Sequence, residues 1–176
     1  MQTSPTLSVI IPLYNKEREI EGTLRSVLAQ KHLPDEIIVV DDGSTDGSAQ
    51  IVERLAAESA LIRLIRQQNA GECAARNCAI AAARGEIIAL LDADDEWEPD
   101  FLGEILSLYR DFPDCGLYCT GFQVISHEGS FPAKAPQREG LSKTFSATRH
   151  TATSPFPRPA PFPSGFLSRW GASPKG

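Results

Sequence analysis

Residues 35–48 read DEIIVVDDGSTDGS, and this stretch decides the fold. The apolar, β-branched run at 37–40 is typical of a strand that is buried on both faces of a sheet. A polar turn with two glycines follows at once. Asp46 can then cap the N-terminus of a helix with core positions at Ile51, Val52 and Leu55. The stretch therefore predicts a buried strand, a tight loop and a helix in direct succession.

The same succession recurs on both sides of this stretch. Strands that alternate with helices imply βαβ crossovers, in which the strands run parallel and helices cover the sheet. The sequence thus predicts an α/β fold, a three-layer α/β/α sandwich with a mostly parallel sheet, related to the Rossmann arrangement. We expect further strands at 7–13, 61–65 and 86–91 and further helices at 16–30, 69–85 and 101–108.

Local signals define the ends of some of these elements. Gly85 suits the C-terminal stop of the helix over 69–85, and Pro99 suits the first turn of the helix that covers Phe101 to Leu108. Residues 116–126 predict one more strand or a hairpin.

Composition limits the classes of protein to consider. The chain has 176 residues, of which 41% are hydrophobic, and a net charge of −6. A negative chain of this kind argues against nucleic-acid binding, which normally uses a basic face. No apolar stretch approaches the roughly 20 residues of a transmembrane helix, and no basic segment precedes the first apolar run as in a secretory signal. The four cysteines have no zinc spacing. We therefore expect a cytoplasmic domain.

Two kinds of sequence join near Gly129. Residues 1–130 hold 10 Lys and Arg against 22 Asp and Glu, whereas residues 131–176 hold 7 against one. Eight of the 13 prolines also lie in the second part. We expect a folded domain at 1–130 and an irregular Pro-, Ser- and Arg-rich tail at 131–176.

Acidic residues follow the strand predicted at 86–91. In open parallel sheets the ligand site lies beyond the carboxyl ends of the strands. Asp92 and Asp94, which are separated by one residue, can turn toward one hard cation such as Mg²⁺. This ion is held by one or two carboxylates and by substrate phosphates. The alternative is a solvated acidic loop before a helix N-terminus, which accounts well for Glu98 and Asp100.

Two other candidates lie at the same predicted edge. Asp41 and Asp42 follow the strand at 35–40, where an acid can accept hydrogen bonds from a base or a sugar, and Gly43 permits close approach of a ligand. An Asx turn that binds nothing is the alternative. Arg76 can face a diphosphate or pair with one of the acids, or lie exposed on its helix.

Three motifs occur together, in order: SVIIPLYNKE at 8–17, IIVVDDGSTDGS at 37–48 and NAGECAARNCAIAAARGEIIALLDADDEWEPDFL at 69–102. In this combination residues 7–126 resemble the N-terminal half of the family-2 glycosyltransferases, inverting enzymes of the GT-A fold. The resemblance implies a nucleotide-diphosphate sugar donor, Mg²⁺ or Mn²⁺, and a saccharide, lipid-linked or other hydroxyl acceptor. It also implies a role in cell-wall or polysaccharide biosynthesis and is compatible with peripheral membrane association.

The resemblance also assigns individual residues. It implies that Asp42 reads the base, that Arg76 lies on the diphosphate side and that Asp94, with Asp92, binds the metal, with Asp95 as a frequent third acid. The residues implied to contact the nucleotide sugar are Pro12, Tyr14, Asn15, Glu17, Asp41, Asp42, Arg76, Asp92 and Ala93.

The catalytic base stays unassigned. In the family it is an acid of the second half, and beyond Gly129 the chain has only Glu139, in no matching context. We therefore expect a donor-binding half that is truncated or followed by a frameshifted tail, with an inactive fragment as the main alternative. A receiver domain is disfavoured because the later strand ends in two spaced acids. A haloacid-type phosphatase is disfavoured because those acids follow the fourth strand.

Overall fold

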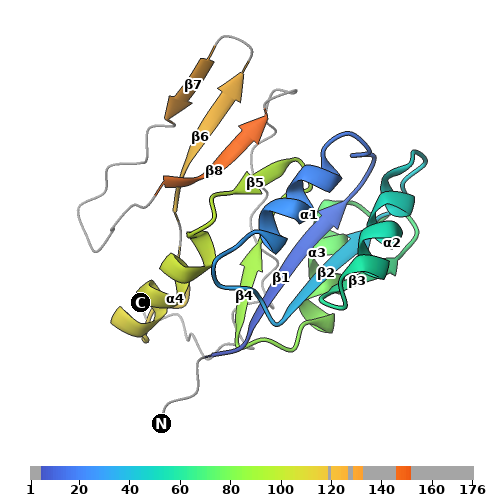
Figure 1. Cartoon of the computed structure of the whole chain (residues 1–176). Helices are drawn as coiled ribbons and strands as arrows, with labels where there is room; N and C mark the ends of the chain where they lie inside the picture. Colours follow the sequence, from blue (N-terminus) through green and yellow to red (C-terminus); the bar gives the residue numbers. More distant parts are fainter. Residues whose placement is uncertain (1–4, 119, 127–128, 133–145, 152–176) are drawn as a thin grey trace, which may run out of the picture.

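The structure is a computed structural model of the chain, and it describes residues 5–118, 120–126, 129–132 and 146–151 (Figure 1). Helices and strands alternate through most of this part. In chain order the elements are β1 (Leu7–Leu13), α1 (Ile20–Leu28), β2 (Glu36–Asp41), α2 (Ser48–Glu58), β3 (Ile62–Arg66), α3 (Glu72–Ala82), β4 (Ile87–Leu90), β5 (Asp95–Trp97), α4 (Phe101–Asp111), β6 (Gly121–Ser126), β7 (Gly129–Pro132) and β8 (Ser146–Thr151).

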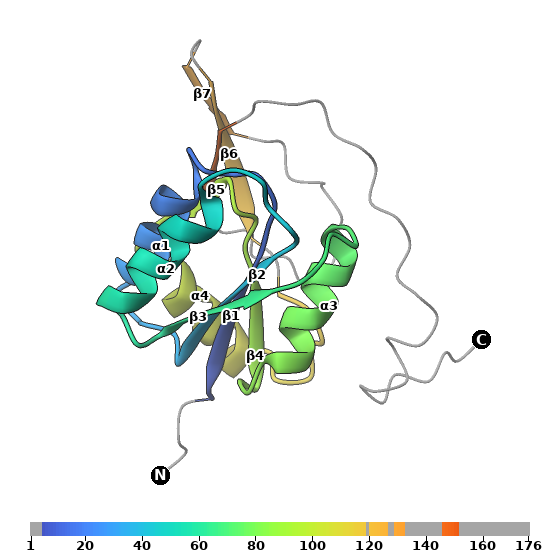
Figure 2. The same ribbon diagram turned by 90° about the vertical axis from the view of Figure 1, so that its right-hand side faces the viewer.

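The first sheet is parallel, with the strand order β3-β2-β1-β4. Figure 2 shows α1 and α2 on one side of this sheet and α3 on the other. The α4 side chains share the core of α1 and α2. The three-layer α/β/α arrangement predicted from the sequence is therefore confirmed, as is the α/β class.

Strand β1 shows why the sheet needs two helical layers. All seven of its residues are buried. Val9 and Ile11 belong to the larger core, on the side of α1, α2 and α4, whereas Ile10 belongs to a smaller core with Ala75 and Ala79 of α3. Because successive side chains of a strand point to opposite faces, a strand that is apolar at every position must be covered on both.

A second sheet has the order β5-β8-β6-β7. Strands β6 and β7 form an antiparallel hairpin, which confirms the strand or hairpin expected over 116–126, and β8 pairs in parallel with β6 and antiparallel with β5. Two parts of this sheet differ from expectation. Residues 95–97 were expected in a loop, and 146–151 lie in the segment expected to be irregular. The pairing joins residues about 50 positions apart, which no local pattern signals. Residues 133–145 and 152–176 of the expected tail lie outside the described residues.

Helix starts depart from expectation in two places. Helix α1 begins at Ile20 rather than at residue 16, and residues 17–19 form a turn. Helix α2 is capped at Gly47, although the Asp46 carboxylate still accepts the Ser48 N–H at 3.0 Å. Val52 is fully buried in α2, whereas Ile51 is half-buried.

Gly85 has a different function from the predicted one. Helix α3 ends in the extended residue Ala83, and the backbone of Gly85 does not have a positive φ. Instead, a Cβ at Gly85 would lie 2.5 Å from the Ser8 nitrogen. Gly85 is therefore required for the close approach of the chain to β1.

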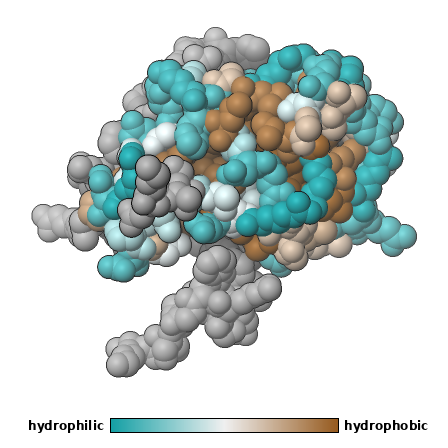
Figure 3. Space-filling view, turned by 60° about the horizontal axis from the view of Figure 1, so that its bottom comes forward, coloured by the Kyte–Doolittle hydropathy of each residue, from teal (hydrophilic) through white to brown (hydrophobic). Residues whose placement is uncertain are grey.

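Part of the described surface is apolar (Figure 3). Figure 3 brings the bottom of Figure 1 forward, and hydrophobic residues gather there on one side, bordered by hydrophilic ones. Large hydrophobic side chains that are exposed include Leu33, Leu90 and Leu117. Among the helices that the structure describes, none has the length and apolar character needed to cross a bilayer.

Candidate functional site

The carboxyl ends of the parallel strands bring the predicted loops together. Strands β1, β2 and β4 all point upward in Figure 1, so the segments that follow them share one edge of the sheet. Contacts across this edge join residues that are far apart in the chain, such as Lys16 with Asp94 and Ala70 with Asp42. The sheet thus gathers the predicted site residues as the sequence suggested.

Asp92 and Asp94 each pair with a basic side chain. The Arg76 guanidinium donates to Asp92 Oδ1 at 2.6 Å and also pairs with Glu72, and Lys16 Nζ donates to Asp94 Oδ2 at 2.7 Å. The side chains of Asp92 and Asp94 are 46% and 31% exposed. This geometry excludes the alternative in which Arg76 lies unengaged on its helix, and it leaves both carboxylates open to solvent on one side.

The third acid of this group is in a different environment. Asp95 opens β5 and is buried. Burial, and next the negative charges of Asp92 and Asp94, raise the pKa of Asp95 to about 8. This carboxyl group therefore retains its proton in much of the population at neutral pH, unlike a solvated acid of a surface loop.

The charge on Lys16 is well supported by its neighbours. Burial by itself would lower the pKa of Lys16, but the hydrogen bond to Asp94 and the charges of Asp94, Glu19 and Asp92 outweigh burial and raise that pKa. Lys16 was not among the residues that the sequence singled out, although it lies within the first motif.

The acid pair fits a divalent cation that shares its ligands with a substrate. Among the residues that the structure describes, no three Asp, Glu, His or Cys side chains are arranged to hold a metal ion by themselves. Mg²⁺ commonly takes only one or two carboxylates and completes its shell with phosphate oxygens and water. Asp92 and Asp94, half-exposed and on either side of the buried Ala93, provide such a partial set.

The loops after β1 and β2 are bonded to each other. Asn15 N–H donates to Ser44 Oγ at 3.0 Å, and Asn15 Oδ1 accepts from Thr45 N–H at 2.8 Å. Glu17 N–H donates to Asp46, and the Glu17 carboxylate accepts from Gly47 N–H at 3.2 Å. Asn15 has a φ of 50°, a left-handed conformation that asparagine tolerates better than most residues. The side chains of Asn15 and Glu17 thus hold these two loops in register.

Pro12 lies inside β1, within the strand expected at 7–13, and is buried. It pairs with Val40 of β2, whereas the register with β4 ends at Ile10 and Leu90. A proline is tolerated here because the missing N–H faces the side of β1 where strand pairing has ended. Tyr14, two residues later, is 48% exposed at the same edge.

Asp41 and Asp42 are both buried and hydrogen-bonded. Asp42, only 2% exposed, accepts from the N–H groups of Ala70 and Gly71, both at 2.8 Å, and from Gln67 Nε2 at 2.7 Å. Burial opposes ionisation, but these hydrogen bonds outweigh it and lower the pKa of Asp42. Asp41 accepts the Ser44 N–H at 3.0 Å, which is the Asx turn considered as the alternative for this pair. Asp42 thus fixes the loop that leads into α3.

Two polar residues of α1, and Gln30 just beyond its C-terminal end, hold the backbone that carries the acids, and the sequence analysis missed all three. Thr23 Oγ1 donates to the carbonyl of Ala93 at 2.8 Å, and Ser26 Oγ accepts the Trp97 N–H at 3.1 Å. Gln30 donates to the Glu98 carbonyl and accepts from Leu102 N–H. Positions 23, 26 and 30 lie on one face of the helix predicted at 16–30. Polar residues on the buried face of that predicted helix were the signal by which the sequence could have identified them.

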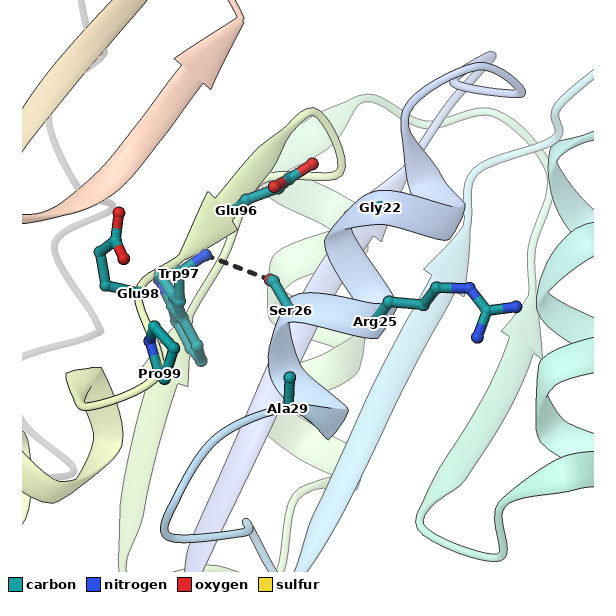
Figure 4. A pocket seen from close by; sticks show the side chains of 8 residues that line it. All are labelled: Gly22, Arg25, Ser26, Ala29, Glu96, Trp97, Glu98 and Pro99. Atoms are coloured by element: carbon teal, nitrogen blue, oxygen red, sulfur yellow. Dashed lines mark hydrogen bonds between the residues drawn. The ribbon is translucent and has the colours of Figure 1, made fainter.

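A hollow of about 410 Å³ lies between α1 and the β5 segment (Figure 4). The Ser26–Trp97 hydrogen bond crosses one side of it, and Arg25 and Glu96 extend from opposite elements. No residue of the predicted nucleotide site lines this hollow. Its lining residues are Gly22, Arg25, Ser26, Ala29, Glu96, Trp97, Glu98 and Pro99.

Two solved structures resemble the chain. TarS of S. aureus in complex with UDP-GlcNAc is 28% identical with a TM-score of 0.57. The match covers 69% of this chain and 34% of that one. The mannosyltransferase PcManGT of Pyrobaculum calidifontis in complex with GDP-Man and Mn²⁺ is 32% identical with a TM-score of 0.56. The match covers 69% of this chain and 35% of that one.

Curated relatives give the same relationship at the sequence level. An uncharacterized glycosyltransferase of Nostoc sp. is 44% identical over 105 residues, which are 59% of this chain and 33% of the relative. The putative teichuronic acid biosynthesis glycosyltransferase TuaG of Bacillus subtilis is 37% identical over 127 residues, which are 72% of this chain and 50% of the relative. The chain thus spans half or less of the length of these relatives.

The match to the family model extends from residue 8 to residue 166, past the boundary that we expected near residue 130. It includes the loops with Asn15, Asp42 and Asp94. By this match the chain belongs to glycosyl transferase family 2.

Proposed function

We propose that this chain binds the nucleotide diphosphate of an activated sugar at the carboxyl edge of the first sheet, together with Mg²⁺ or Mn²⁺. The observation that carries the proposal is the acid pair Asp92 and Asp94, half-exposed at the end of β4 and each already in contact with a cation. The transferase would pass the sugar to a hydroxyl acceptor with inversion. UDP-GlcNAc in TarS and GDP-Man with Mn²⁺ in PcManGT support this class of donor and metal.

The residues at the edge have distinct roles in the proposed reaction. Asp94, with Asp92, would hold the metal, which when bound neutralises charge on the departing nucleoside diphosphate. Arg76 is placed beside Asp92 to contribute further positive charge to the same region. Tyr14 is exposed at the edge and available to the nucleotide.

The buried residues would act through the loops that they hold. The Asp42 carboxylate is hydrogen-bonded to Gln67 and Gly71 and holds the segment between them. We therefore propose that Asp42 positions this segment at the nucleotide site and does not itself contact the nucleotide. Asn15 and Glu17 would act similarly on the loops after β1 and β2. The base that deprotonates the acceptor remains unassigned among the described residues, and we keep the prediction that it belongs to the second half of the family's fold.

Calorimetric titration with UDP, GDP and their sugars, in Mn²⁺ and in EDTA, tests the proposal. We expect one of the nucleotides to bind in Mn²⁺ and to bind at least about tenfold more weakly in EDTA. Asp94→Asn should abolish this difference, since an amide keeps the shape but not the charge of the ligand. Asp100→Asn is the matched control, because Asp100 is an exposed acid whose partner, Lys31, lies outside the proposed site.

Absence of metal-dependent nucleotide binding by the folded wild-type chain would refute the proposal and favour the inactive fragment. If metal strengthens nucleotide binding equally in wild type and in Asp94→Asn, only the role assigned to Asp94 is refuted.

A further inference from the structure

Lys16 occupies the carboxylate that is proposed to bind the metal. Its ammonium group lies 2.7 Å from Asp94 Oδ2, and the two side chains are 33% and 31% exposed. An ammonium at this distance uses a lone pair that a divalent cation would need. Lys16 and a metal therefore compete for the same oxygen.

The backbone of Lys16 is held on both sides. Its N–H donates to Ser48 Oγ at 2.8 Å, and its carbonyl accepts from Glu19 and from Ile20 at the start of α1. The side chain thus extends from a fixed point toward Asp94. Because a lysine side chain is a flexible four-carbon stem with a single charged group, it can leave Asp94 without movement of the loop.

Arg76 provides a contrast on the neighbouring acid. Its guanidinium is engaged by two carboxylates, Asp92 and Glu72. A planar group held from two sides is less free to turn away than an ammonium group held by Asp94. Among the described residues, Lys16 is thus better suited than Arg76 to exchange with a metal.

We propose that Lys16 is an internal counter-ion that holds Asp94 in the metal-free state and is displaced from it when the metal binds with the donor. The displaced ammonium then lies within reach of the incoming diphosphate. This inference rests on the proposed function and adds a competitor for the metal to that same site.

The exchange would couple metal and nucleotide binding. A metal that arrives alone must separate Lys16 from Asp94 and leave two like charges close together, which opposes binding. A diphosphate supplies negative charge to both the metal and the released ammonium. Each ligand should therefore strengthen the binding of the other by the same factor.

Manganese titration of Lys16→Met tests this exchange directly, with no need for turnover. We expect Lys16→Met to bind Mn²⁺ alone about tenfold more tightly than wild type. At saturating Mn²⁺ it should bind nucleotide more weakly, so that the factor by which metal and nucleotide strengthen each other's binding becomes smaller. Lys16→Arg should preserve more of the coupling than Lys16→Met does. Arg18→Met is the matched control, because it removes one positive charge from an exposed side chain two residues away.

The outcomes separate the two proposals. If wild type binds nucleotide with Mn²⁺ but Lys16→Met binds Mn²⁺ no more tightly, the counter-ion role is wrong and the proposed function stands. An equal change in Lys16→Met and Arg18→Met would also overturn the role, since it would reflect net charge alone. If the folded wild type binds neither ligand, the proposed function itself fails. Circular dichroism and thermal melting establish that each variant is folded.

Discussion

Two pairs of acids end two strands of the same parallel sheet, and the fold uses them differently. Asp41 ends β2 and Asp42 follows it; both are buried, with their oxygens accepting N–H groups from nearby loops. Asp92 and Asp94 follow β4 and are half-exposed, with basic side chains as partners. A buried acid whose oxygens accept several N–H groups holds a loop, whereas a half-exposed acid paired with a lysine can exchange that lysine for another cation. Both pairs thus lie at a strand end where a ligand can bind, and the neighbouring side chains and N–H groups decide whether each pair holds a loop or can bind a ligand.

The largest expected effect is on stability, from Asp42→Ala. This change removes the buried carboxylate that accepts from the N–H groups of Ala70 and Gly71 and from the amide of Gln67, and these three hydrogen bonds are part-buried. We expect the free energy of unfolding to fall by about 3 kcal/mol, measured by urea denaturation. Asp94→Ala, the counterpart in the other pair, should change it by less than about 1 kcal/mol, because it breaks a part-exposed ion pair. Equal losses in both variants would contradict the distinction between the pairs.

An intermediate effect is expected from Thr23→Val, which tests how the second pair is held. The substitution preserves the shape of the side chain but removes the hydroxyl that donates to the Ala93 carbonyl between the two acids. We expect a loss of about 1–2 kcal/mol in unfolding free energy.

The same variant should weaken metal-dependent nucleotide binding by about tenfold, because the acids lose a support. Thr23→Ser retains the hydroxyl and should restore binding. If Thr23→Val lowers stability but leaves binding unchanged, Thr23 supports the fold and not the site.

The smallest expected effect concerns the pH dependence of stability through Asp42. Its pKa is lowered in the folded state, because the hydrogen bonds that it accepts outweigh burial. A lowered folded-state pKa means that the unfolded chain binds more protons, so this contribution is present above the unfolded pKa of about 3.9 and is lost as the pH falls through the folded value. We expect the difference in unfolding free energy between wild type and Asp42→Asn to shrink below about pH 4. A difference that grows as the pH falls would reverse the assigned sign.

The first sheet and its helices could be predicted because their signals are local. The runs at Leu7–Leu13 and Glu36–Asp41 are apolar at almost every position, and each is followed by helical periodicity. The end of each strand also located the acids. The strand expected at 7–13 is confirmed as β1, but the end of its pairing with β4 at Ile10 is not encoded in the sequence around Pro12.

What the sequence by itself determined is the α/β class, the order of the elements, the family and the edge of the sheet at which the acids gather, since burial patterns and motifs are read along the chain. Only the tertiary structure decided what each acid contacts. Lys16 meets Asp94 across 78 positions, Thr23 meets Ala93 across 70, and Asp42 meets Gly71 across 29. The strand β5, with its partner β8, likewise depends on distant pairing. These contacts arise only when loops from separate strands meet, and so the same residue type became a loop support at Asp42 and a candidate metal ligand at Asp94.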